Sequence, residues 1–174
     1  MRIFISIKFL PKTLIQIKSI QENLPEFSGK KTEIKNLHLT LKFLGKASFE
    51  DIERIKLKLR KIKFNKFEAE IKEIGFFDKQ EGRGILWLGV TNCESFQKEI
   101  DNSLEGLYKR EQRFMGHLTI ARAKKISNKK KFIGDLKKIK IPKRFFIVDK
   151  FYLMESELRK EGPEYKVLEE YFLN

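Results

Sequence analysis

Two histidines occur in the 174-residue chain, and both begin the same short motif. His38 opens a His-Leu-Thr-Leu segment, and His117 opens a His-Leu-Thr-Ile segment 79 residues later. Imidazole has an unperturbed pKa near neutrality, so two imidazoles can divide the roles of general acid and general base between them. A single histidine beside apolar residues is usually structural. The use of both histidines in one repeated motif therefore favours a catalytic pair.

The two threonines of the motifs share a face with the histidines if each segment is a β strand. Residues two apart in a strand point the same way, so His38 lies beside Thr40 and His117 beside Thr119. The intervening leucines would then point into a core. By the same alternation Phe43 is assigned to the core, with stacking on a nucleobase as the alternative.

The repeat extends beyond the histidine motifs. Lys46 and Lys125, like Ser48 and Ser127, are separated by the same offset as the histidines, and each serine follows its histidine by ten residues. A serine at that place can start a helix, and Asp51 after the first serine completes the pattern of a capping box. We interpret the repeat as a duplicated strand–helix unit. Two lobes related by an approximate twofold axis would bring the two polar pairs together across one cleft.

Alternation and apolar spacing predict the elements that position the motifs. Strands are expected over 2–9, 34–44, 67–77, 84–90, from 117, over 144–154 and over 165–172, and helices over 11–24, from 48 to about 62, over 96–107 and over 128–139. This order lacks regular β-α-β alternation and favours an α+β fold, with antiparallel sheets flanking a central cleft and helices on the outside. The length suits a single two-lobed domain over 1–174. A complete cleft within one chain makes a monomer the expected state.

Composition restricts the class of protein. The chain has one cysteine and no run of roughly 18 apolar residues, so we expect no disulfide, no membrane span and a cytoplasmic protein. Its net charge is +14, and residues 124–144 alone hold ten basic residues and one acid. A second run, over 54–66, holds seven basic residues and no acid. Two basic runs favour a nucleic-acid partner.

Two imidazoles, two hydroxyls and nearby cations suit chemistry at a phosphodiester. One imidazole would take a proton from the attacking oxygen and the other would protonate the leaving oxygen. Two histidines without a third ligand make a poor metal set, so no metal is expected. The alternative is a non-catalytic basic RNA-binding module in which both motifs are structural.

The segments from His38 to Gly45 and from His117 to Arg122 resemble the two HxTx signature motifs of the two-histidine phosphoesterase superfamily. The most similar branch is the 2′-5′ RNA ligase-like proteins, also called RNA 2′,3′-cyclic phosphodiesterases. The resemblance runs nearly end to end, and it is carried also by the segments 2–5, 75–77, 86–90, 152–156 and 162–165.

The resemblance implies a hydrolase that converts a terminal 2′,3′-cyclic phosphate of RNA to a 2′-phosphate without metal or other cofactor. The reverse reaction would join RNA ends through a 2′-5′ link, and tRNA fragments are among the implied substrates. His38 would protonate the departing O3′, and His117 would activate water, although the two roles could be exchanged. Thr40, Thr119 and Arg122 would bind the phosphate.

Two departures from a simple pattern concern the second motif. Arg122 is five residues from His117, so a regular strand would place it on the opposite face, and it needs a strand end or a bulge to reach the cleft. Gly116 stands where relatives commonly have proline. Trp87 and Tyr165 also match the family, and we interpret both mainly as packing residues.

Overall fold

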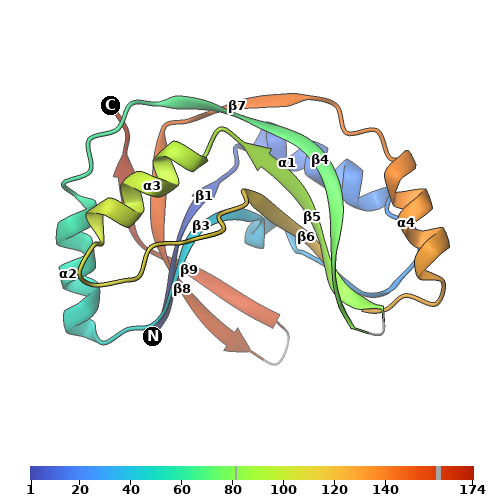
Figure 1. Cartoon of the computed structure of the whole chain (residues 1–174), viewed down its shortest axis with the longest axis horizontal. Helices are drawn as coiled ribbons and strands as arrows, with labels where there is room; N and C mark the ends of the chain where they lie inside the picture. The colour runs from blue at the N-terminus through green and yellow to red at the C-terminus, as the bar shows by residue number, and fades with distance from the viewer. Residues whose placement is uncertain (81, 160–161) are drawn as a thin grey trace.

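The computed structural model describes residues 1–80, 82–159 and 162–174. The elements, in chain order, are β1 (Arg2–Lys8), α1 (Pro11–Glu22), β2 (Ser28–Lys31), the 3₁₀ helix η1 (Ile34–Asn36), β3 (His38–Lys46), α2 (Phe49–Leu59), β4 (Phe67–Gln80), β5 (Arg83–Thr91), α3 (Glu94–Ser103), β6 (His117–Lys125), α4 (Lys129–Lys138), β7 (Arg144–Val148), β8 (Lys150–Arg159) and β9 (Gly162–Phe172). Within those residues the strands form an antiparallel sheet in the order β7-β4-β5-β6-β3-β1-β8-β9, and β2 pairs with β6. The α+β class with antiparallel strands is confirmed (Figure 1).

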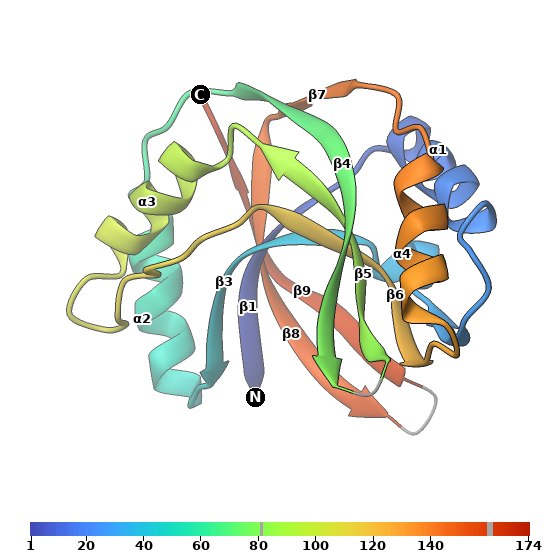
Figure 2. The ribbon, with the colours of Figure 1, turned by 45° about the vertical axis from the view of Figure 1, so that its right-hand side comes forward.

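The sheet has two parts, β7-β4-β5-β6 and β3-β1-β8-β9. They meet where β3 pairs with β6. A single position, Leu39 opposite Leu118, joins these two strands in the described structure. Beyond it the strands diverge, and Figure 1 shows β4, β5 and β6 to the right of β1, β3, β8 and β9. Figure 2 shows helices α2 and α3 at the left flank of the molecule and α1 and α4 at the right flank. Each histidine therefore begins a strand at the junction of the two parts.

The apolar pattern of the sequence accounts for the buried side of these elements. Leu39 and Leu118 are fully buried, as are the apolar positions Ile52, Ile55 and Leu59 on α2. The predicted capping box also forms, because the Ser48 side chain accepts a hydrogen bond from the Asp51 backbone N–H and Asp51 accepts from Ser48. The helix of the second copy, α4, is capped one residue later than expected, by the Asn128 side chain rather than by Ser127.

Both histidine strands carry a β-bulge at the same place in the repeat. The register of β1 against β3 skips Leu41, and the register of β5 against β6 skips Ile120. Each bulge inserts one residue and reverses the side-chain alternation directly after it. As a result Lys42 is buried, whereas Phe43 is 75% exposed. Our assignment of Phe43 to the core is therefore wrong.

Several predicted boundaries also differ from the structure. The strand expected over 144–154 is two strands, since the chain breaks at Asp149 and β7 pairs with β4 while β8 pairs with β1. The strand expected from residue 34 starts with the turn of η1 and becomes extended only at His38. Leu107 lies beyond α3, which ends at Ser103. Strand β2 was not predicted, because all four of its residues are exposed and none is apolar. None of the helices in the described residues is long and apolar enough to cross a membrane.

Candidate active site

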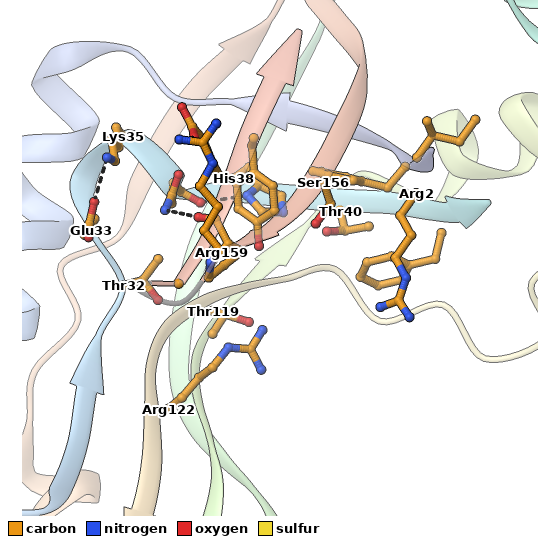
Figure 3. A pocket seen from close by; sticks show the side chains of 18 of the residues that line it. Arg2, Thr32, Glu33, Lys35, His38, Thr40, Thr119, Arg122, Ser156 and Arg159 are labelled. Carbon is orange, nitrogen blue, oxygen red and sulfur yellow. Dashed lines mark hydrogen bonds and ion pairs between the residues drawn. The ribbon is translucent and has the colours of Figure 1, made fainter. Parts of the chain in front are cut away.

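A cavity of about 880 Å³ lies at the junction of the two parts of the sheet. All five residues proposed from the sequence line it: His38, Thr40, His117, Thr119 and Arg122. Figure 3 shows Thr119 next to Arg122, and Thr40 next to Ser156 with Arg2 beyond them. Further cations line the same cavity, namely Lys30, Lys31, Lys35, Lys46 and Arg159. The cavity therefore combines two imidazoles with a strongly basic wall.

The two imidazoles are anchored in the same way. Nδ1 of His38 lies 2.7 Å from the carbonyl oxygen of Asn36, and Nδ1 of His117 lies 2.8 Å from that of Met115. A carbonyl can only accept a hydrogen bond, so Nδ1 carries the proton and donates in both rings. Nε2 is then left for a substrate, as an acceptor in the neutral ring and a donor in the protonated ring. In each copy the carbonyl belongs to the residue two positions before the histidine.

Two aromatic rings enclose His38. Its imidazole lies 4.9 Å from the ring of Phe4 and 4.9 Å from the ring of Tyr165, which meets it edge-on. Burial lowers the pKa of His38 to about 4, because desolvation outweighs the hydrogen bond to Asn36, and the charges of Lys8 and Arg122 lower it further. His38 is thus neutral near pH 7 in the free protein. Tyr165 contacts a candidate catalytic ring directly, which goes beyond the packing role expected for it.

A second aromatic pair supports His117. The ring of Phe77 meets the His117 imidazole edge-on at 5.2 Å, and Phe77 stacks on Trp87 at 5.0 Å. Trp87 in turn covers Gly75, where an added Cβ would lie 2.2 Å from the indole ring. Trp87 is therefore a packing residue, and it reaches His117 only through Phe77.

Gly116 permits a close approach between two strands immediately before His117. Val90 donates its backbone N–H to the carbonyl of Gly116 at 2.8 Å, and a Cβ on Gly116 would lie 2.2 Å from the carbonyl oxygen of Val90. A side chain at this position would push β6 away from β5. Glycine in place of proline therefore allows this close backbone contact. Gly116 does not itself line the cavity, so the difference removes no cavity side chain.

The bulge at Ile120 resolves the difficulty with Arg122. Because the alternation reverses there, Arg122 points to the same side as His117 and Thr119 and lines the cavity. Its partner in the neighbouring strand β2 is Lys30, which also lines the cavity. The guanidinium can offer a forked pair of donors to a phosphate.

Asn36 is a site residue that sequence reasoning missed. Its carbonyl holds His38, and its side-chain amide donates to the carbonyl of Pro163 on β9 at 3.0 Å. The β8–β9 hairpin is therefore tied to His38 twice, through Asn36 and through the ring of Tyr165. No local motif signals this link, since 127 residues separate Asn36 from Pro163.

A buried ion pair lies on the opposite face of β3 from the cavity. Lys42 is bonded to Asp101 of α3 at 2.5 Å, and their side chains are 5% and 4% exposed. Asp101 also accepts from the Gln97 side chain and from the backbone N–H of Glu111, both at 2.9 Å. Although burial raises the pKa of Asp101, these donors outweigh it and the pKa is lowered. The bulge at Leu41 is what turns Lys42 toward this partner.

Comparison with known proteins places the chain in a family. The family model described as LigT like Phosphoesterase matches residues 9–87. The chain is 33% identical to the RNA 2′,3′-cyclic phosphodiesterase of Methanocaldococcus jannaschii, over 98% of this chain and 100% of that protein. It is 34% identical to the Thermotoga maritima protein of the same name, over 98% and 94% of the two chains. The chain belongs to the LigT-like phosphoesterase family. Its relatives in these comparisons are RNA 2′,3′-cyclic phosphodiesterases.

Solved structures agree on the fold. The crystal structure of TT0787 from Thermus thermophilus matches with a TM-score of 0.81 at 22% identity, over 99% of this chain and 97% of that one. E. coli LigT in complex with 3′-AMP matches with a TM-score of 0.77 at 22% identity, over 99% and 98%. The α+β fold of this chain is therefore a LigT-like fold.

Proposed function

We propose that the protein hydrolyses terminal 2′,3′-cyclic phosphates of RNA to 2′-phosphates, with His38 and His117 as its acid–base pair. One observation carries this proposal. The only two histidines of the chain line the same cavity, each with Nδ1 held by a carbonyl and Nε2 left for substrate. The names of the relatives support the substrate class.

The geometry suits a two-step proton transfer around one phosphorus. Nε2 of His117 takes a proton from water as the water oxygen bonds to phosphorus, and the bond from phosphorus to O3′ breaks. Nε2 of His38 gives its proton to O3′, which leaves a 3′-hydroxyl and a 2′-phosphate. Each such transfer is typically worth about 10²–10⁴-fold in rate. Thr40, Thr119 and Arg122 donate to the non-bridging oxygens, where charge develops.

His38 must gain a proton to act as the acid. Its pKa of about 4 in the free protein reflects burial and the positive charges of Lys8 and Arg122. A bound phosphate anion offsets those charges and raises the pKa, so the proton is taken up with the substrate. The exchanged assignment, with His38 as the base, uses the neutral ring directly. The pH dependence of kcat/KM has the same bell shape for both assignments, because each needs one protonated and one neutral imidazole. A cyclic phosphate with sulfur in place of O3′ separates them, since its leaving group needs no proton and restores turnover only to the alanine variant that lacks the acid.

The paired architecture supports a duplicated origin. β3 and β6 have the same burial pattern over nine residues, each with its bulge at the fourth. The two histidines also make the same bond to the carbonyl two residues earlier. We infer that two copies of one strand–helix unit form two lobes with the cleft between them. Since all lining residues come from one chain, a monomer suffices for the reaction.

Phe43 is proposed to stack on the base of the terminal nucleotide. It occupies the position in the first copy that Arg122 occupies in the second, and it is exposed at the cavity. Base–aromatic stacking is worth about 1–3 kcal/mol, so Phe43→Ala should slow turnover about 10-fold or more, while Phe43→Trp retains it. Phe172, which is 71% exposed and does not line the cavity, provides the control variant Phe172→Ala. Equal effects of the two alanine variants would contradict the stacking role.

The decisive experiment uses a short RNA that ends in a 2′,3′-cyclic phosphate. We expect a 2′-phosphate product in the presence of chelator, and loss of nearly all turnover in His38→Ala and in His117→Ala. Adding a second RNA with a free 5′-hydroxyl tests the reverse joining reaction through a 2′-5′ link. Binding of the RNA without turnover would instead identify the basic RNA-binding module, the second candidate. Metal independence is tested in the same assay.

A further inference from the structure

We propose that the inner face of β2, β6, β5 and β4 binds the single-stranded body of the RNA outside the cavity. This inference rests on the proposed function and extends it, because it names a surface that only an oligonucleotide can reach. The surface, which we call the basic face, begins at the cavity with Lys30 and Arg122 and continues outside it with Arg83 and Lys124. Below their junction, β4, β5 and β6 diverge from β8 and β9 (Figure 1).

Strand register places these four cations on one side of the sheet. Lys30 is paired with Arg122 across β2 and β6, and both line the cavity. Lys124 follows Arg122 by two residues and therefore shares its face. On β5, Arg83 precedes Ile85 by two residues, and Ile85 is paired with Arg122. All four cations are exposed, so the basic wall of the cavity continues outward along this part of the sheet.

Acids among the described residues do not neutralise three of the four cations of the basic face. Among the residues that the structure describes, Arg83, Arg122 and Lys124 form no ion pair. On the β8–β9 hairpin across the cavity, by contrast, Arg159 is paired with Glu164 at 2.6 Å and with Glu157 at 3.1 Å. Unpaired exposed cations attract phosphates, whereas paired ones contribute little. The RNA body should therefore follow the basic face and not the β8–β9 hairpin.

Aromatic rings on the same face add to this chemistry. Phe77 is paired with Ile85, so its ring shares the side of the cavity residues, and Trp87, which is paired with Thr119, stacks on Phe77. Cations interleaved with aromatic rings are typical of surfaces that bind single strands. From His117 to Lys124 the strand spans roughly 20 Å at about 3.3 Å per residue. A mononucleotide in the cavity cannot cover that length, but a longer strand can.

The test compares two double charge reversals of equal size. Arg83→Glu/Lys124→Glu changes the basic face, and Lys137→Glu/Lys140→Glu changes exposed lysines of and after the outer helix α4. Binding of a single-stranded decanucleotide that ends in a 2′-phosphate is measured by fluorescence anisotropy over a range of salt concentrations. At low salt the first variant should bind about 10-fold or more weakly, with a salt slope shallower by about 1.4 for two lost contacts. The α4 variant should change affinity by less than about threefold.

Turnover of a 2′,3′-cyclic mononucleotide is the parallel measurement, and it should stay within about twofold in both variants because neither touches the cavity. Equal weakening of RNA binding by the two variants, or no weakening by either, overturns the basic face. Preferential weakening by Arg2→Glu/Lys46→Glu also overturns it, since the strand would then leave over the other part of the sheet. If the unmodified protein turns over no cyclic phosphate, the proposed function fails, while the binding comparison still decides the basic face.

Discussion

Protonation of His38 should destabilise the folded protein. The pKa of its imidazole falls from an ordinary 6.5 to about 4 on folding, chiefly because the half-buried ring loses water. The unfolded chain therefore binds a proton at a higher pH than the folded chain. Stability is retained above pH 6.5 and is lost as the pH falls toward 4. At about 1.4 kcal/mol per pKa unit, the loss between pH 7 and pH 4 is about 3 kcal/mol.

Two measurements check this expectation. With two histidines in the chain, each Cε1 proton gives one resonance in a titration followed by NMR, and His117→Gln identifies the signal of His38. The His38 signal should titrate near pH 4 in the free protein and at a higher pH with inorganic phosphate bound. Urea unfolding at pH 7 and pH 4 measures the energy, and His38→Gln removes this group while carboxylates titrate in both proteins.

The unmodified protein should lose about 3 kcal/mol more than His38→Gln over that pH range. Equal losses in the two proteins, or a His38 signal that titrates near 6.5, would refute burial as the origin of the lowered pKa.

Three further predictions concern groups around the cavity. Arg122→Lys keeps the charge but loses the forked donor pair, so kcat should fall about 10²–10³-fold, and full activity would exclude a bidentate contact. Asn36→Ala removes one of the two ties between the hairpin and His38 and keeps the carbonyl that holds Nδ1, so kcat should fall about 10-fold and the His38 pKa, followed by NMR, should rise toward 6.5. A lower rate with an unchanged pKa would contradict the positioning role. Lys42→Met leaves Asp101 charged and buried, so the free energy of unfolding should fall by about 3–5 kcal/mol, as measured with urea. Lys42→Met/Asp101→Leu should recover part of that loss, and a double variant as unstable as the single one would show that the pair itself is not responsible.

The sequence predicted the polar faces of the two motifs because alternation acts over two or three residues. His38 lies with Thr40 and His117 with Thr119, as expected, since both pairs precede the bulges. After a bulge the same rule fails, which is why Phe43 was placed on the wrong side. A bulge depends on how a neighbouring strand is aligned, and one sequence read locally does not contain that alignment.

Other features were hidden for related reasons. β2 has no apolar residue and forms because β6 offers it an edge, so no hydrophobic pattern predicts it. The contact of Asn36 with Pro163 joins residues far apart in the chain, and only the finished sheet brings them together. The family resemblance supplied Arg122 even though simple alternation argued against it, and the bulge at Ile120 reconciles the two.

The single backbone pairing between Leu39 and Leu118 has an evolutionary consequence. Since the two histidine strands are joined by ladder hydrogen bonds at one position, the angle between them can change without breaking the pairing inside either part. A small rotation there would widen or narrow the cavity while each histidine kept its own carbonyl and aromatic neighbours. Descendants of such a scaffold can thus adapt to larger or smaller leaving groups through substitutions at this pivot, with both catalytic motifs left intact.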